Sequence, residues 1–289
     1  MSIGNADPAP FLSSVVHATD FSPASERAFA HALAIAVLRR ASLALLHVTS
    51  DGHRDWTGFP AVRKTLERWN LLAPGSRQEE VLAAVGVRVS KIEIASRFPS
   101  LAVASYLDAH PADLLVVATE GREGVGRWLQ GSKAEAMARW SGTMTLFVPA
   151  DAPRGLVAAA DGNLTLESVL VPVDRTPEPS AAIELARRTA EVAGDGEVRI
   201  ALLHVGEEAS MPRPATRDGA GWKFERECRP GDPVEEIVTA ADRLRANLVV
   251  MPTAGRHGVF EALRGSTTER VLRRAPCPVL AVPAAAGGD

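Results

Sequence analysis

The sequence predicts an α/β protein made of two similar halves, each with five strands in a parallel sheet covered by helices. One observation behind this is an internal repeat: residues 115–132 recur as residues 249–266, shifted by 134 positions. Both copies keep a glycine, an arginine directly after it and a later Gly-Ser pair, which indicates duplication and not chance. The other observation is that continuously apolar runs alternate with helix-like segments, as in parallel sheets covered on both faces.

In the first half, the expected order is strand, helix, strand, helix, strand, helix, strand, loop, helix and strand. Ser14 begins an apolar strand. Ser22 and Pro23 then suit the N-cap and first position of a helix of about 17 residues. The remaining segments predict helical stretches at 60–85 and 99–110 and strands at 43–48, 87–95, 114–117 and 145–148.

The second half repeats this order with fewer residues. Thr176-Pro177 is expected to begin its first helix and Asp232-Pro233 the later one, with Glu235 completing a capping box. Matching histidines are 157 positions apart and matching glycine loops 134, so about 23 residues are missing between them. The gap falls opposite the 60–85 helical region, and we expect a loop in its place. The expected segments are strands at 169–173, 198–205 and 278–282 and the loop at 207–221.

Length and composition indicate two ordinary globular domains. The 289 residues suffice for domains at 1–150 and 168–289, joined by a linker at 151–167. Hydrophobic residues make up 46%, and the net charge of −3 argues against a nucleic-acid surface. We see no apolar run of the roughly 18 residues that a membrane helix needs, and no secretory signal. We therefore expect a cytoplasmic protein that binds neither nucleic acid nor membrane.

The cysteines and histidines do not have metal-ligand spacing. Cys228 and Cys277 are expected to be small apolar residues beside strands. The seven histidines form no cluster, so no metal site is expected. His47 and His204, which end equivalent strands, are expected to be satisfied polar residues at the end of a sheet.

Three features together resemble the universal stress protein family: an aspartate that ends the first strand (Asp20), Leu-Leu-His-Val that ends the second, and the spacing Gly-x9-Gly-Ser. The C-terminal segment 265–282 is also very similar to the signature of that family. The resemblance covers essentially the whole chain, as a tandem pair. It implies open sheets in the order 3-2-1-4-5, with ligands at the carboxyl ends of the strands where that order reverses. The apolar last strands should join the halves as a pseudo-dimer.

ATP-binding members of this family carry the motif Gly-x2-Gly-x9-Gly-(Ser/Thr). The resemblance implies that Asp20 holds adenine, with Val48 beside it. It also implies that phosphates lie against Gly121, Gly131 and Ser132. The matching residues in the second half are Asp174, Val205, Gly255, Gly265 and Ser266.

Both halves depart from this motif at its first glycine, which is replaced by Ala118 and by Pro252. Alanine adds only a methyl group and keeps its N–H, whereas proline fixes φ and donates no hydrogen bond. If one half binds nucleotide, we therefore expect it to be the first.

Simpler interpretations stay open for the same residues. Ser132 and Ser266 each stand three positions before a glutamate, so a capping box explains both without a ligand. Asp20 and Asp174 also suit the backbone donors at a strand end. The glycines suit plain turns, although the repeated x9 spacing favours a loop that cradles a ligand.

Catalytic motifs are missing from the sequence: it has neither G-x-x-x-x-G-K-[ST] nor G-x-S-x-G, and we expect no enzyme. Two functions remain open. The first is a nucleotide-responsive stress protein that binds ATP or AMP, with or without Mg, in one or both halves and acts as a homo-oligomer. The second is a degenerate member that serves as a scaffold or binds another small ligand. An adenylyl-transferring enzyme of the same architecture is a weaker third.

Overall fold

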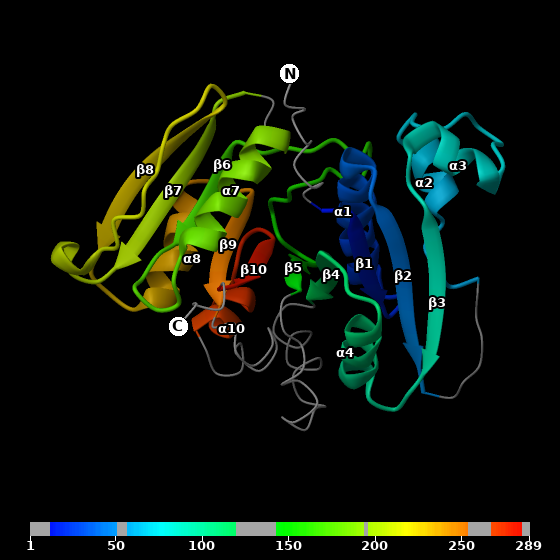
Figure 1. Ribbon diagram of the computed structural model, residues 1–289, viewed down its shortest axis with the longest axis horizontal. Coiled ribbons are helices and arrows are strands. Elements are labelled where there is room, and N and C mark those ends of the chain that lie inside the picture. The colour runs from blue at the N-terminus through cyan, green and yellow to red at the C-terminus, as the bar shows by residue number, and fades with distance from the viewer. Residues whose placement is uncertain (1–11, 51–56, 120–142, 194–195, 254–266, 285–289) are drawn as a thin grey trace, which may run out of the picture.

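The computed structural model describes residues 12–50, 57–119, 143–193, 196–253 and 267–284 (Figure 1). Its strands are β1 (Ser14–Thr19), β2 (Ser42–Thr49), β3 (Val89–Ala95), β4 (Leu114–Thr119), β5 (Met144–Pro149), β6 (Ser168–Pro172), β7 (Val198–Val205), β8 (Trp222–Arg229), β9 (Leu248–Thr253) and β10 (Val279–Pro283). Its helices are α1 (Pro23–Arg39), α2 (Val62–Arg68), α3 (Gln78–Val85), α4 (Pro99–Ala109), α7 (Ser180–Ala193), α8 (Pro233–Arg243) and α10 (Thr267–Leu272), with a 3-10 turn η1 (Glu208–Ser210).

The strands form one ten-stranded sheet in the order β3-β2-β1-β4-β5-β10-β9-β6-β7-β8. Each half thus has the order 3-2-1-4-5, counted from its outer edge. β5 and β10 pair antiparallel, as expected of the two last strands, and so join the two five-stranded sheets of the halves into one. Leu280 lies opposite Leu146 at this seam. Edge-to-edge pairing satisfies the backbone groups of two apolar strands that would otherwise be exposed.

In each half, a side chain that precedes the fourth strand accepts hydrogen bonds from the backbone at the start of the first strand. Asp113 Oδ2 accepts hydrogen bonds from the backbone N–H groups of Ser13 (2.7 Å) and Ser14 (2.9 Å). Asn247, 134 positions later, accepts through Oδ1 from Glu167 N (2.9 Å) and Ser168 N (3.1 Å). The sequence repeat is therefore also a repeat of hydrogen bonding.

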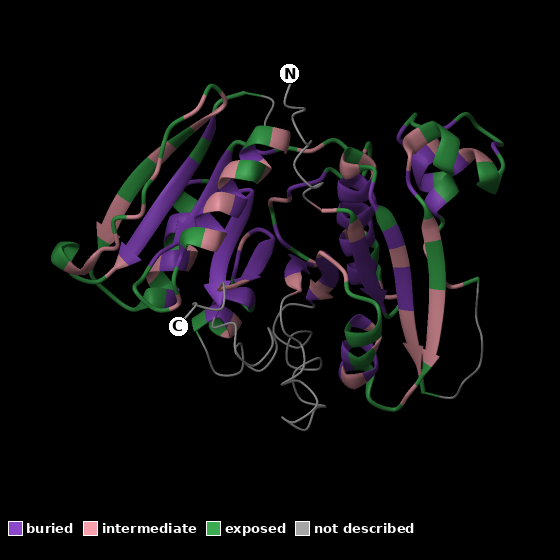
Figure 2. Ribbon diagram, viewed as in Figure 1, coloured by how far each residue is buried: buried purple, intermediate pink, exposed green. Residues whose placement is uncertain are grey.

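Helices cover both faces of the sheet (Figure 1). α1 and α7 pack on one face, and α4, α8 and α10 pack on the other. Strand side chains alternate between the two cores, as Val15 and Val16 do. Figure 2 shows that the inner strands are largely buried while β3 and β8 at the two edges are partly exposed. Of the described helices, none is long and apolar enough to cross a membrane.

Of the three helix starts predicted from capping residues, two are confirmed. Ser22 caps α1 by accepting from Ser25 N, and Pro23 is its first residue. Asp232 caps α8, although Glu235 does not complete the capping box, because its carboxylate pairs with Arg274. The start expected at Thr176-Pro177 is wrong. α7 begins at Ser180, whose N–H is accepted by the Glu178 carboxylate at 3.0 Å.

The region that differs most between the halves follows the second strand. In the first half it contains α2 and α3, and in the second only η1 and a loop. The loop leads into β8, the third of the five strands expected in this half, whose position was not predicted from the sequence. Trp222 and Phe224 of β8 pack with Met211 against the core on the α7 face. The sheet beneath is consequently buried despite the missing helices.

The segment between the halves is packed against α1. Arg27 donates from Nη1 to the carbonyl oxygens of Ala152 (2.7 Å) and Ala150 (3.2 Å), and from Nη2 to that of Arg154 (3.3 Å). One turn later, His31 Nε2 accepts from Val157 N at 3.3 Å. The expected linker is therefore an ordered part of the molecule over its described residues.

We expect Arg27→Ala to lower the free energy of unfolding by about 2 kcal/mol. The substitution removes charge-assisted bonds to three carbonyl groups, part of which water replaces. Urea unfolding measures this value, with Arg63→Ala as the control. Arg63 is an exposed residue that pairs with Glu67 one turn away, so its loss should cost less than about 0.5 kcal/mol. Equal effects of the two substitutions would contradict the stabilising role of the hydrogen bonds between Arg27 and the segment that joins the halves.

Candidate functional site

The structure brings three of the sequence-predicted residues to one edge of the sheet. Asp20 follows β1, while Val48 and Ala118 lie at the carboxyl ends of β2 and β4. β1 lies between the other two strands, so the strand order reverses there. In parallel sheets this reversal leaves a crevice where ligands commonly bind.

The carboxylate of Asp20 shapes the turn that leaves β1. Its Oδ1 atom accepts from Ser22 N at 3.0 Å and from Ser22 Oγ at 2.6 Å. The simpler interpretation of Asp20, as an acceptor for backbone donors at a strand end, is thus confirmed. The side chain is exposed, so its role in the turn leaves it accessible to a ligand.

An aromatic cluster beside this turn was not predicted from the sequence. Phe21 has a left-handed backbone (φ 63°), and its ring stacks on His47 with centroids 3.9 Å apart. Phe59 meets Phe21 edge-on at 5.3 Å. His47 itself bonds through Nδ1 to Thr19 O at 2.8 Å, which confirms the expected satisfied polar residue. No sequence pattern signalled these contacts, because Phe59 comes from a distant loop.

A buried polar network lies beneath the same edge. His17 is fully buried and bonds through Nδ1 to Val116 O at 3.0 Å. Ser25 Oγ lies 3.5 Å from His17 Nε2 and donates to Thr19 Oγ1 at 2.9 Å. Burial lowers the pKa of His17 to about 4, although the bond to Val116 and the charge of Asp20 oppose the shift. His17 is therefore neutral at physiological pH.

The second half keeps part of this geometry. Asp174 follows β6 and accepts from Arg175 N at 2.7 Å, and Val205 ends β7. His204 bonds through Nδ1 to Val173 O at 3.0 Å, as His47 does to Thr19. Its Nε2 atom lies 2.8 Å from Ser210 Oγ, where the first half instead stacks a phenylalanine on the histidine ring. The expected satisfied role of His204 is confirmed.

Prolines distinguish the two strand reversals. β1 and β4 pair from Val15–Leu114 to Ala18–Val117, whereas β6 and β9 pair only at Val169–Leu248 and Leu170–Val249. Beyond that point the second half has Pro172 and Pro252, at the positions of Ala18 and Ala118. Proline cannot donate to a ladder, so the pairing ends early.

The other predicted site residues lie outside the described part of the chain. They are Gly121, Gly131, Ser132, Gly255, Gly265 and Ser266. Among the described residues, no group of three or more His, Cys, Asp or Glu side chains could hold a metal ion. Cys277 is fully buried, and burial raises the pKa of its thiol to about 12, as suits a small apolar residue. Cys228 is half-buried on β8, and its thiol donates to Gly206 O at 3.2 Å.

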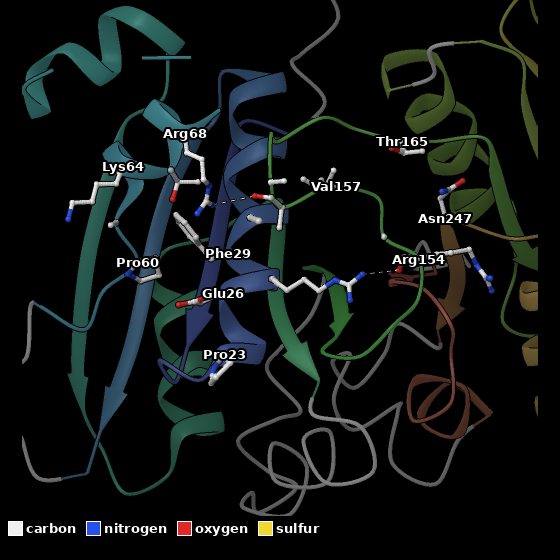
Figure 3. A pocket seen from close by; sticks show the side chains of 18 residues that line it. Pro23, Glu26, Phe29, Pro60, Lys64, Arg68, Arg154, Val157, Thr165 and Asn247 are labelled. Atoms are coloured by element: carbon white, nitrogen blue, oxygen red, sulfur yellow. Dashed lines mark hydrogen bonds between the residues drawn. The ribbon is translucent and has the colours of Figure 1, made fainter. Parts of the chain in front are cut away.

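A cavity of about 1110 Å³ near this region does not lie at the strand ends (Figure 3). It runs across α1, between α2 and the segment joining the halves. Pro23 and Glu26 place one end of it directly after the Asp20 turn. This cavity was not predicted from the sequence, because its wall is the segment expected to be a plain linker.

Comparison with known proteins supports the resemblance. The chain matches the model of the Universal stress protein family over residues 13–149 and 215–283. It is 40% identical over 81 residues to a universal stress protein of Methanocaldococcus jannaschii, across 28% of this chain and 48% of that one. A Thermus aquaticus universal stress protein is 44% identical over 52 residues, 18% of this chain and 38% of its own. The chain thus spans less than half the length of these curated relatives.

Solved structures agree on the fold. A universal stress protein from Archaeoglobus fulgidus aligns with 96% of this chain and 98% of its own, with a TM-score of 0.59 and 18% identity. At that identity the likeness speaks for the architecture alone. The family model, however, matches well over half of the chain and has segments in both halves. The chain belongs to the universal stress protein family.

Proposed function

We propose that this tandem universal stress protein binds an adenine nucleotide, ATP or AMP, at the strand reversal of its first half. Asp20 would hold the adenine with Val48 beside it, and the segment that follows Ala118 would hold the phosphates. The observation that carries the proposal is the accessible Asp20 carboxylate at the reversal of β1 and β4, beside strand ends that keep their N–H groups.

The second half is proposed as a degenerate copy. Pro172 and Pro252 remove two backbone donors at its strand reversal. Each lost donor removes a charge-assisted hydrogen bond to phosphate, which is worth about 1.5–3 kcal/mol. Its loss would weaken nucleotide binding roughly ten- to a hundredfold. Asp174 and Val205, with Gly255, Gly265 and Ser266, would then serve another ligand or none. This is where the alternative role, as a scaffold or binder of a different small molecule, fits best.

The biological setting follows from the family and stays a proposal. A protein of this kind would act in a stress response by changing its partners when nucleotide binds, most simply as a homo-oligomer in the cytoplasm. Mg²⁺ would accompany ATP through the phosphates, because the described residues provide no carboxylate cluster for it.

Paired substitutions at the equivalent aspartates test which half binds. We expect Asp20→Ala to weaken ATP binding at least tenfold in a calorimetric titration, because it removes the proposed contact to adenine, a bond to a charged group. Asp174→Ala, which makes the matching change in the second half, should alter the affinity less than about twofold. Far-UV circular dichroism checks that both variants fold.

Gly131→Val and Gly265→Val give an independent pair in the proposed phosphate-binding segments. Loss of binding in Gly265→Val with retention in Gly131→Val would reverse the assignment of the halves. If the unmodified protein releases no nucleotide on denaturation and shows no heat with ATP or AMP, the nucleotide proposal itself fails.

A further inference from the structure

We propose that the groove across α1 is a second binding site, for a small organic anion with an apolar body such as an aromatic carboxylate or sulfonate. The site is separate from the proposed nucleotide site and does not depend on it. It is formed by α1, by α2 with the two residues before it, and by the segment between the halves, and the described part of the second half has no counterpart of α2.

The groove has the size of a small-molecule site. Its volume of about 1110 Å³ lies just above the range, roughly 300–1,000 Å³, that is usual for ligand pockets. Such pockets combine apolar walls with a few polar groups that fix orientation. Here the apolar part of the lining includes Pro23, Phe29, Ala30, Pro60 and Val157. An apolar ring or chain fits that surface.

The charge of the groove is positive. Arg27 and Arg68 both line it, and their hydrogen bonds within the described structure go to backbone carbonyls, Arg68 donating to Ala159 O at 3.3 Å. A carbonyl stabilises a guanidinium group but leaves its net charge in place. Lys64 adds a third cation from α2, and Glu26 supplies one carboxylate. Three positive charges against one negative charge favour an anionic ligand.

A fourth cation is already neutralised. Arg154 also lines the groove, but its Nη2 atom pairs with Asp242 at 2.7 Å. Figure 3 shows its side chain directed away from α1, whereas Arg68 reaches from α2 toward the segment that holds Val157. The anion would therefore sit between α2 and α1, near Arg68 and Lys64, with its apolar part over Phe29.

The test uses two probes with the same rings. 8-Anilinonaphthalene-1-sulfonate carries the anionic group, and N-phenyl-1-naphthylamine lacks it. We expect saturable fluorescence enhancement with one equivalent of the sulfonate and at least about fivefold weaker binding of the neutral probe. Absence of saturable sulfonate binding to the folded protein, or equal affinity for the two probes, would overturn the proposal.

Variants of α2 then locate the site. Lys64→Gln and Arg68→Gln should each weaken the sulfonate about three- to tenfold and leave the neutral probe unchanged. Lys64 has no hydrogen bond to the segment between the halves among the contacts described, so its variant separates loss of charge from loss of that contact. Arg63→Gln is the matched control, because Arg63 lies on the same helix, pairs with Glu67 and lines a second cavity that includes Lys64 but not Arg68. Equal weakening by Arg63→Gln, or no weakening by Lys64→Gln and Arg68→Gln, would place the probe elsewhere and overturn the proposal.

Discussion

The free energy of unfolding should fall by about 4 kcal/mol between pH 7.5 and pH 5. His17 and His31 are both completely buried, and burial lowers the pKa of each to about 4. In the unfolded chain a histidine has a pKa near 6.5. Between these values the unfolded state binds more protons than the native state, so stability is full above pH 6.5 and is lost as the pH falls toward 4. At pH 5 each histidine accounts for about 2 kcal/mol.

His31→Gln isolates one of the two contributions. The amide of glutamine can donate to Arg27 O and accept from Val157 N, as the imidazole does, but it does not titrate. Urea unfolding at the two pH values should show the fall reduced by half in this variant. His110→Gln is the control, since His110 is exposed at the end of α4 and its loss should leave the fall unchanged. A fall below about 1 kcal/mol in the unmodified protein would contradict the burial argument.

The elements that the sequence predicted well are those fixed by local physics. Ser22 and Pro23 start α1 because their own side chains favour that position. Apolar runs such as 114–117 are inner strands because they suit burial on both faces. The aspartates could likewise be placed from sequence, because the carboxyl ends of parallel strands share one edge of a sheet.

The start of the first helix in the second half shows where two local signals competed. Proline is frequent at the first position of a helix, which favoured a start at Pro177. Three residues later, Ser180 begins α7, and the Glu178 carboxylate accepts from its N–H. An acidic side chain near the first turn also stabilises a helix start. The sequence alone did not show which of the two signals would decide.

The parts that the sequence did not predict depend on contacts between distant segments. The cavity across α1 needs Arg27 and Arg68 to hold a segment more than 80 positions away, which no local pattern reveals. β8 alternates in polarity, but its neighbouring loop concealed where the strand begins. The stacking of Phe21 on His47 likewise joins residues that come from separate elements.

We expect the two halves to unfold as one unit, coupled through the seam between β5 and β10. Leu146 and Leu280 lie opposite each other there and are 2% and 7% exposed. Each Leu→Ala substitution should lower the free energy of unfolding by about 2–4 kcal/mol, because it leaves a cavity in the shared core. The unfolding curves from circular dichroism and from tryptophan fluorescence should coincide in urea.

A double-mutant cycle measures the coupling across the seam directly. Leu146→Ala and Leu280→Ala combined should depart from additivity by about 1 kcal/mol, since directly opposed side chains share the cavity that each substitution creates. Leu203→Ala with Leu146→Ala is the matched control: Leu203 is equally buried, but β9 and β6 as well as β10 separate its strand from β5. That pair should be additive within about 0.5 kcal/mol. If the effects of Leu146→Ala and Leu280→Ala are additive, or if urea unfolding shows two separate transitions, the two halves unfold independently although their strands pair.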